Sequence, residues 1–358
     1  MLLEITSGDK IICEYLINNK GINDQCRQNN RILMPKECDK CKKNPSIYLR
    51  QYSGEFLCRK CFIKSVEYKA KRTISKYSMI KHGDKVAVAV SGGKDSLVLL
   101  NVLKNTLSSQ KPELVAITVD EGIKGYRDES LDIVKNFCSS VGIKNKVVSF
   151  SELFGLSMDK AMEIRPSEKI TSCSMCGTFR RRAIDLLAES CGANVIATGH
   201  NLDDYVQTFL INLFAGDVER IGWTYPEPVE YGATNLRKIK PLMEIYEREI
   251  VLYAIHMNIP FQSEECPYKD ESIRSAFRSH LNNLEKLHPG IKYNAYSSIL
   301  KIAKKVKSAN APSTSILNDI VQQEHRRCTI CNRDSSNNIC SVCRTLGVLV
   351  KKQAGEYS

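Results

Sequence analysis

Apolar segments that alternate with helical segments between residues 84 and 214 constrain the fold of this chain more than any other feature. The apolar segments predict strands at residues 86–90, 114–119, 146–150 and 194–198. Helical periodicity is found at residues 97–107, 131–141, 179–191 and 203–214. This alternation favours right-handed βαβ units, and therefore an α/β fold with a doubly wound parallel sheet. In such sheets, ligands bind at the carboxyl ends of the strands.

A phosphate-binding loop is predicted where the first strand ends. Its residues are Ser91, Gly92, Gly93, Lys94, Asp95 and Ser96. Because the two glycines are adjacent, this loop is not a Walker A motif, which needs four residues between its glycines. Adjacent glycines instead indicate a tight turn into a helix N-terminus, whose free N–H groups face an anion. A merely capped helix start is the alternative, and the six-residue match after an apolar strand makes it the weaker one.

Composition limits the classes of protein that remain. The 358 residues include 52 Lys and Arg against 40 Asp and Glu, a net charge of +12 that favours polyanionic partners. No apolar run approaches the roughly 18–20 residues of a membrane span, and MLLEITSGDK lacks the apolar core of a signal peptide. We therefore expect a soluble protein of a reducing compartment, whose cysteines bind metal or react.

Eight of the fifteen cysteines form two sets of paired Cys-x-x-Cys motifs. This spacing predicts two zinc ribbons, in which each motif turns two thiolates towards one Zn²⁺ ion. A hairpin around Ser53 and Gly54 would join the motifs of the first ribbon. Ordinary buried cysteines are the alternative. The predicted ligands are Cys38, Cys41, Cys58 and Cys61 in the first ribbon, and Cys328, Cys331, Cys340 and Cys343 in the second.

The ribbons bracket the predicted α/β domain. Cys138 and Cys191 lie in apolar helical contexts and are expected in the core, whereas Cys13 and Cys26 have no assigned partner. We expect an N-terminal extension (1–35), a first zinc ribbon (36–66), a basic linker helix (67–82), a catalytic domain (83–235), a helical part carrying Cys266 (236–310), a linker (308–315) and a second zinc ribbon (325–350).

Three basic runs, 67–82, 237–240 and 301–307, form a candidate track for RNA. Each run taken singly is typical of a solvated surface. The single Trp223 is expected to be a packing residue rather than a platform for base stacking.

The phosphate loop resembles the PP-loop of the N-type ATP pyrophosphatases, which have a Rossmann-like sheet and cleave ATP between its α and β phosphates. Four further stretches resemble the TtuA/NcsA-type tRNA 2-thiouridine synthetases within that group. They are CSMCGTFRR, ATGHNLDD, DEGIKGYRDES and IKPLMEIYEREIV. The resemblance covers roughly residues 36–350, including both ribbons, and implies a cytoplasmic enzyme that acts on tRNA.

The chemistry that this resemblance implies is sulfur transfer. ATP, with Mg²⁺, would adenylate the C2 oxygen of a tRNA uridine, and sulfur would then displace AMP. In this group, Cys173, Cys176 and Cys266 would hold a [4Fe-4S] cluster with one iron free of protein ligands, where sulfide binds.

Other chemistries stay open for these three cysteines. One is a cysteine persulfide resolved through a disulfide between Cys173 and Cys266. Others are zinc on the same thiolates, or a structural knuckle beside a buried cysteine. A PP-loop ligase without sulfur chemistry would not need these cysteines at all. A non-catalytic RNA-binding ribbon protein would not need the intact phosphate loop.

The resemblance also assigns residues around the nucleotide. It implies that Gly199 lies near the nucleotide and that the backbone of Val119 meets the adenine. The position of Arg180 one turn after Cys176, rather than the resemblance, suggests that it faces the ATP phosphates, where its charge would stabilise the adenylation step. A solvated face or contact with tRNA phosphates is the alternative. Asp204 is either an acid/base group, a Mg²⁺ ligand or a helix cap, and Asp95 either binds Mg²⁺ or orients the loop.

Several properties stay undetermined at this stage. The relatives modify position 34 or position 54 of tRNA, and the segment HPGIKYNAYSSI (288–299) is more similar to the enzymes that act on position 54. The sulfur donor is either free sulfide or the thiocarboxylate of a ubiquitin-like carrier. A homodimer is plausible from the relatives.

Overall fold

The computed structural model describes residues 36–107, 112–166, 170–226, 230–231, 236–268, 273–309, 327–335 and 337–353. The expected extension 1–35, with Cys13 and Cys26, and most of the linker 308–315 lie outside these ranges. The described residues form two compact units, one of residues 36–65 with 275–291 and one of residues 66–274 with 292–353. Within the described ranges, no helix combines the length and apolar character needed to cross a membrane.

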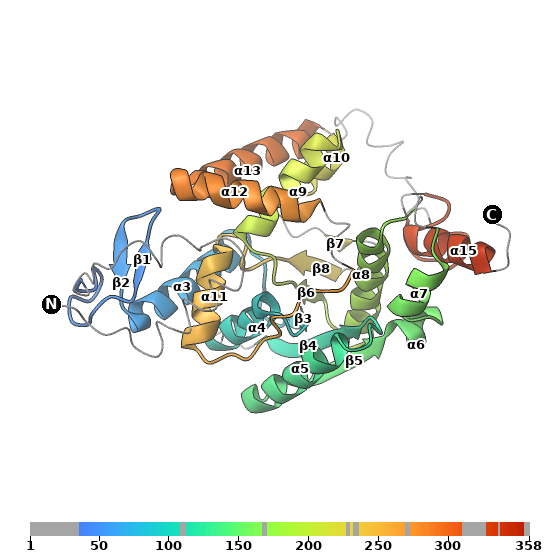
Figure 1. The fold of residues 1–358 in the computed structure, drawn as a ribbon, viewed down its shortest axis with the longest axis horizontal. Helices are drawn as coiled ribbons and strands as arrows, with labels where there is room; N and C mark the ends of the chain where they lie inside the picture. Colours follow the sequence, from blue (N-terminus) through green and yellow to red (C-terminus); the bar gives the residue numbers. More distant parts are fainter. Residues whose placement is uncertain are drawn as a thin grey trace. The chain divides into compact units, whose positions relative to one another are not determined.

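The larger unit is built on a six-stranded sheet with the order β5-β4-β3-β6-β8-β7 (Figure 1). Five neighbouring strands are parallel, and β7 pairs antiparallel with β8 at the edge. The strands are β3 (Lys85–Ala89), β4 (Glu113–Asp120), β5 (Asn145–Ser149), β6 (Val195–Ala197), β7 (Glu230–Tyr231) and β8 (Leu236–Ile239). The predicted parallel α/β sheet is confirmed, and each predicted strand lies within about one residue of its expected bounds.

Strand β8 was missed by sequence analysis because its residues LRKI look like part of a basic surface run. Arg237 in this strand is 4% exposed and forms an ion pair with the buried Asp84. Asp84 also accepts hydrogen bonds from Lys81 N at 2.6 Å and Asn194 Nδ2 at 2.8 Å. Arg237 is therefore part of the sheet's interior, and its assignment to an RNA track is wrong.

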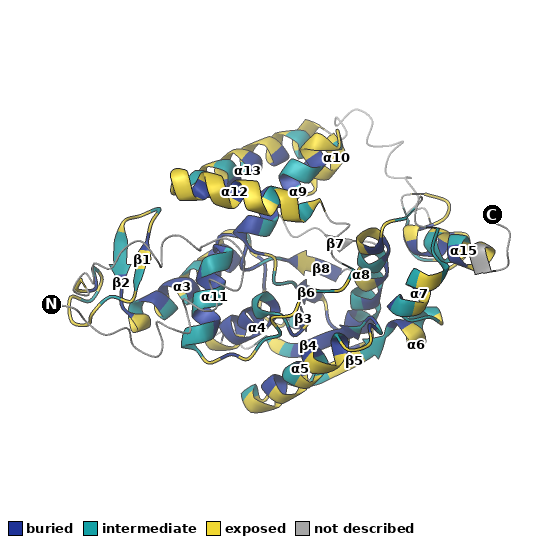
Figure 2. Ribbon diagram, in the orientation of Figure 1, coloured by how far each residue is buried: buried dark blue, intermediate teal, exposed yellow. Residues whose placement is uncertain are grey.

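Helices connect the strands and cover the sheet. Helix α8 (Ser172–Ser190) packs against β4, β5 and β6, and Figure 2 shows buried residues along this helix in dark blue. Its Leu187 and Ala188 contribute to the core against the strands. The others of this unit are α4 (Lys94–Thr106), α5 (Arg127–Val141), α6 (Phe150–Phe154), α7 (Met158–Ile164), α9 (Leu202–Phe214), α10 (Val218–Gly222), α11 (Glu247–His256), α13 (Ile291–Ala309) and α15 (Ser341–Gln353).

Helix α8 begins at Ser172 and not at residue 179 as predicted. Thr171 caps it, because the Thr171 side chain accepts a hydrogen bond from Ser174 N at 3.3 Å. The first turns were missed because Ser, Cys, Gly and Thr have weak helix propensity. Cys173 and Cys176 therefore both lie in the first two turns of this helix.

The smaller unit contains the predicted hairpin of the first ribbon. Strands β1 (Tyr48–Arg50) and β2 (Glu55–Leu57) pair antiparallel, with Arg50 opposite Glu55. Gly54 in the turn has φ +69°, a left-handed conformation that glycine adopts without strain. Two further helices, α3 (Arg59–Lys76) and α12 (Arg274–Leu287), each span the boundary between the units in sequence. Helix α3 replaces the predicted linker helix and begins early enough to include Cys61.

Cys138 and Cys191 are 2% and 9% exposed, which confirms their expected place in the core. Trp223, in contrast, is 67% exposed just after α10. The expectation that Trp223 is a packing residue is therefore wrong.

Candidate functional site

The predicted phosphate loop is the turn between β3 and α4 (Figure 1). Gly92 has φ +86°, and a Cβ at this position would lie 2.7 Å from Ser130 Cβ and 2.8 Å from Ser130 O. Only glycine fits this turn. Gly93 is the N-cap of α4 and has no side chain to cap the helix. The first N–H groups of α4 therefore meet no capping side chain, and the helix dipole favours an anion there.

Lys94 and Asp95 have defined directions in this loop. Lys94 Nζ lies 2.8 Å from Glu247 Oε1 and 3.1 Å from Asp95 Oδ2. Although burial lowers the pKa of Lys94, the charges of Asp95 and Glu247 raise it well above its ordinary value. The lysine is therefore cationic and held at the loop.

The segment after β6 meets the start of α4. A Cβ on Gly199 would lie 2.8 Å from the backbone carbon of Asp95 and 2.9 Å from Ser96 N. Asn201 Nδ2 donates to Asp95 Oδ1 at 2.9 Å. The predicted convergence of SGGKDS and GHNLDD at the strand ends is therefore present.

Asp204 lies in the first turn of α9 and forms a capping box with Asn201. Asp204 N donates to Asn201 Oδ1 at 3.0 Å, and Asn201 N donates to Asp204 Oδ2 at 3.2 Å. Burial, and then the charge of Asp95, raises the pKa of Asp204 to about 6. The geometry of Asp204 is therefore that of a helix cap. Its raised pKa is also compatible with acid/base chemistry near neutral pH.

The three isolated cysteines come together although Cys266 is far from the other two in sequence. The carbonyl of Tyr268 accepts a hydrogen bond from Ser172 Oγ at 3.0 Å and lies 3.9 Å from Cys173 Sγ. Tyr268 also donates its hydroxyl to Asp159 Oδ1 at 2.8 Å. The segment that carries Cys266 is therefore fixed against the first turn of α8.

The three thiols lie close enough to one another to influence each other's pKa. Burial raises the pKa of Cys176, and the thiols of Cys266 and Cys173 raise it further. Burial likewise raises the pKa of Cys266, with Cys173 again contributing. Cys173 is exposed, whereas Cys176 and Cys266 are half-buried against the core. The group is thus open to solvent on one side.

Arg180 lies one turn after Cys176 and points to that thiol and to a carboxylate. Its Nη2 donates to Cys176 Sγ at 3.3 Å, and its Nε lies 2.7 Å from Glu121 Oε1. The charge of Glu121 is the main cause that raises the pKa of Arg180 above its ordinary value. No role is predicted for Glu121 from the sequence, although its position directly after a buried strand is a signal that could have identified it.

The two ribbon sets are confirmed as groups that can bind a metal ion. In each set the four Sγ atoms lie within 4.8 Å of one another. Burial raises the pKa of Cys38, but hydrogen bonds from the backbone N–H groups of Cys58, Cys41 and Lys40 lower it to about 6. Hydrogen bonds from backbone groups of Cys340, Cys331 and Ile330 similarly lower the pKa of Cys328 to about 6. Such N–H groups stabilise the thiolates that Zn²⁺ requires.

The second ribbon packs on α8. Arg333 Nη1 lies 3.0 and 2.9 Å from the two carboxylate oxygens of Glu189. Arg182 Nη1 donates to Cys331 Sγ at 3.7 Å. Cys328, Cys340 and Cys343 belong to one apolar cluster with Met175 and Phe179 of α8. The ribbon therefore supports the same helix that carries Cys173 and Cys176.

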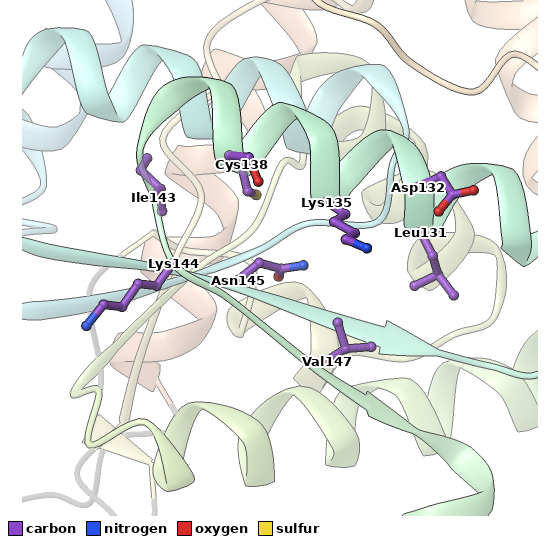
Figure 3. A pocket seen from close by; sticks show the side chains of 9 residues that line it. Leu131, Asp132, Lys135, Cys138, Ile143, Lys144, Asn145 and Val147 are labelled. Atoms are coloured by element: carbon purple, nitrogen blue, oxygen red, sulfur yellow. The ribbon is translucent and has the colours of Figure 1, made fainter.

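A pocket of about 440 Å³ lies elsewhere, between α5 and β5 (Figure 3). It is lined by Leu131, Asp132, Lys135, Cys138, Ser139, Ile143, Lys144, Asn145 and Val147. None of the predicted ATP, thiol or ribbon residues lines it, and we assign it no role in the candidate site.

The chain is similar to known proteins over most of its length. The family model described as the PP-loop domain matches residues 63–285. The chain is 35% identical over 321 residues to cytoplasmic tRNA 2-thiolation protein 1 of Aspergillus niger, covering 89% of this chain and 90% of that protein. It is 34% identical over 326 residues to a probable sulfurtransferase of Methanocaldococcus jannaschii, covering 90% and 91%.

A solved structure is similar over nearly the whole chain. The U34-tRNA thiolase NcsA from Methanococcus maripaludis, solved with its [4Fe-4S] cluster, has a TM-score of 0.70 and 32% sequence identity. The match covers 88% of this chain and 96% of that one.

Proposed function

Because this chain belongs to the PP-loop family of tRNA 2-thiolation enzymes, we propose that it is an ATP-dependent tRNA uridine 2-sulfurtransferase acting in the cytoplasm. ATP adenylates the C2 oxygen of a uridine, pyrophosphate leaves, and sulfur then displaces AMP. One observation carries the proposal: a phosphate loop and a three-thiol group lie at the carboxyl ends of one parallel sheet, joined by Glu121 and its arginines.

Position 34 is the target that the similarity favours. The solved relative is described as a U34 thiolase, and the match to it spans 88% of this chain. This similarity outweighs the short segment 288–299, which suggested position 54 and forms the loop before α13 and its first half.

The residues of the ATP site have distinct tasks in this proposal. Backbone N–H groups at Gly93 and the first turn of α4 bind the phosphates, together with the hydroxyls of Ser91 and Ser96. Lys94 supplies positive charge, Asp95 takes part in binding Mg²⁺, and Gly199 leaves room for the loop. The Val119 carbonyl already accepts from Arg127 Nη2 at 2.7 Å, so we assign the adenine contact to the Val119 N–H. Asp204 acts as a base when ionised.

The three thiols fit a cluster better than a single ion. Their sulfur atoms do not gather within 4.8 Å as those of the ribbons do among the described residues, and their donor set is three thiolates with an exposed side. Cys173, Cys176 and Cys266 would hold a [4Fe-4S] cluster, and Cys38, Cys41, Cys58, Cys61, Cys328, Cys331, Cys340 and Cys343 would hold two Zn²⁺ ions. When bound, a cluster with three protein ligands leaves one iron available for the sulfur that is transferred.

In this arrangement Arg180 acts at the thiols and not at the phosphates. Its guanidinium contacts Cys176 and Glu121, and it stabilises negative charge near the transferred sulfur. The sulfur donor, free sulfide or a thiocarboxylated carrier, would approach from the side where Cys173 is exposed.

The test is a defined reaction with anaerobically purified protein. Unmodified tRNA, ATP, Mg²⁺ and sulfide should give 2-thiouridine, AMP and pyrophosphate in equal amounts, measured by mass spectrometry of nucleosides and by nucleotide chromatography. Metal analysis should give about four irons and two zincs per chain. A fully active preparation without iron would overturn the cluster as the source of the transferred sulfur. AMP formation with substrates other than tRNA would favour a PP-loop ligase.

A further inference from the structure

Glu121 is a buried carboxylate held between two arginines. It follows the core of β4 and is 2% exposed. Its Oε1 lies 2.7 Å from Arg180 Nε, and its Oε2 lies 2.7 Å from Arg127 Nε. The second contact is an ion pair whose N–H is not aligned as a hydrogen bond. A carboxylate in this position is stable because two cations compensate its loss of water.

On one side, Arg127 is anchored to both walls of the candidate nucleotide site. It is 4% exposed, and its Nη1 donates to Ser91 O at 2.8 Å. Its Nη2 donates to Val119 O at 2.7 Å. Ser91 opens the phosphate loop, and Val119 is the residue assigned to the adenine. Any shift of the loop on nucleotide binding therefore reaches Arg127 directly.

On the other side, Arg180 depends on Glu121 for its direction. Its side chain is 48% exposed, so packing alone does not fix it, whereas the carboxylate beside it is 3% exposed and rigidly placed. From this position its Nη2 reaches Cys176 Sγ at 3.3 Å. Without the carboxylate, the guanidinium is free to turn to solvent.

We propose that Glu121 is a positioning residue that couples the nucleotide site to the three-thiol site by aiming Arg180 at Cys176. The inference builds on the proposed function but concerns a different property, the transmission of nucleotide binding to a thiol. Coupling of this kind requires continuous contacts with defined directions, and Ser91, Arg127, Glu121, Arg180 and Cys176 supply them.

The test measures how fast Cys176 is alkylated, with and without a nucleotide. The full-length protein is first freed of iron by purification in air with a reductant, and metal analysis checks this, so that Cys176 is a free thiol. It is then treated with iodoacetamide in the presence or absence of α,β-methylene-ATP, which cannot be cleaved between its α and β phosphates. Peptide mass spectrometry follows Cys176. In the wild-type protein the nucleotide should slow alkylation about fivefold, the lower end of ordinary coupling between sites. Binding of the analogue is measured separately by calorimetry.

Glu121→Gln keeps the shape of the side chain and removes its charge. We expect this variant to bind the analogue within about threefold of wild type, because Arg127 keeps its two carbonyl partners, while the ratio of alkylation rates falls to about one. If the variant does not fold, Arg180→Lys tests the same path, since a half-exposed side chain tolerates the change. Glu163→Gln is the matched control: it removes the charge of an exposed carboxylate paired with Lys160 and should keep the wild-type ratio.

Two results would overturn the inference: a wild-type ratio of one, or a Glu121→Gln or Arg180→Lys protein that keeps the fivefold ratio. Thiolation of tRNA by the wild-type protein, run in parallel, separates this inference from the proposed function. A protein that shows the nucleotide effect on Cys176 but does not thiolate tRNA would overturn the function and retain the positioning role.

Discussion

Asp203 and Asp204 are adjacent in sequence but have different surroundings. Asp203 is 4% exposed, forms an ion pair with Lys292 and accepts a hydrogen bond from Glu247 N at 2.8 Å. Its charge is used in holding helices together. Asp204 is paired only loosely with Arg274, at 3.8 Å, and its pKa is raised. At the residue scale, the sequence offered two equivalent carboxylates, and only their contacts distinguish the structural one from the candidate base.

The raised pKa of Asp204 predicts a pH dependence. If the ionised carboxylate is the base, thiolation should rise with pH through about 6 and level off above it. Asp204→Asn should remove the rise of the rate with pH and lower the rate above pH 6 by about 10²–10⁴-fold. Initial rates at saturating ATP between pH 5 and 8 measure this. An unchanged profile in the variant would assign Asp204 to capping alone.

The same shift affects stability with a definite sign. Because the folded-state pKa lies above the ordinary value of 3.8, the folded protein binds this proton more tightly than the unfolded chain. The stabilisation of the folded protein that this bound proton provides is fully present below about pH 4, and it is lost as the pH rises through about 6. Asp204→Asn should flatten that part of the curve of unfolding free energy against pH.

Substitution of Cys266 tests the three-thiol site. Cys266→Ala should abolish thiolation and remove iron while leaving both zinc ions, because the segment of Cys266 lies against Cys173 and Cys266 belongs to neither ribbon. Cys138→Ala is the control, since this buried thiol lies in the core of α5, away from the three-thiol group, and should cost only stability, about 1 kcal/mol. Metal analysis and nucleoside mass spectrometry read both variants. Full activity of Cys266→Ala would refute the three-thiol site.

At the scale of elements, helix α8 links the thiols to the second ribbon. The ribbon's Cys328, Cys340 and Cys343 pack with Met175 and Phe179, and Arg333 pairs with Glu189 near the other end of the helix. Sequence spacing predicted the ribbon as a separate unit. It did not predict that the ribbon packs on the helix of the candidate centre, because packing partners are not encoded in spacing.

Removing the ribbon's metal should therefore loosen α8. Cys328→Ser should lose one zinc per chain and increase amide hydrogen exchange in α8, because the ribbon's share of the apolar cluster depends on the metal. Cys58→Ser, in the other unit, should lose one zinc without changing exchange in α8. Equal protection of α8 in both variants would show that the ribbon does not support the helix.

Strand β8 provides a second prediction at this scale. Arg237→Met leaves the buried Asp84 without its cation and should cost about 3–5 kcal/mol in unfolding free energy. Lys238→Met, on the exposed side of the same strand, should cost at most about 1 kcal/mol. Urea denaturation measures both. A stable Arg237→Met protein with weaker tRNA binding would instead indicate that Arg237 contacts RNA.

At the scale of the whole molecule, the net charge of +12 raises the question of which surface binds the RNA backbone. Arg181 on α8 is exposed and forms no ion pair within the described ranges; loss of hydration and then the like charge of Arg220 lower its pKa. Arg220 lies on α10, just before the exposed Trp223. Arg220 also forms an ion pair with Asp217 at 3.1 Å, but its charge still disfavours the charge of Arg181. An RNA phosphate between the two arginines would relieve this repulsion.

Arg181→Ala combined with Arg220→Ala should therefore weaken tRNA binding and reduce its salt dependence, by about one unit of slope for each phosphate that the variant no longer binds. Lys135→Ala combined with Lys144→Ala removes the same amount of charge from the pocket between α5 and β5. This variant should change neither the affinity for tRNA nor its salt dependence. Filter binding across a salt series measures both. Equal effects of the two pairs would indicate charge in general rather than a tRNA surface.

The sequence alone determined the parallel α/β sheet, the phosphate loop and the eight ribbon cysteines, because periodicity, glycine pairs and Cys-x-x-Cys spacing are local patterns with direct physical consequences. Tertiary structure decided what lies far apart along the chain. It brought Cys266 to Cys173, placed Glu121 between Arg127 and Arg180, and buried Arg237 while exposing Trp223. Such contacts depend on which strand ends meet and which helices pack, and no local pattern specifies them.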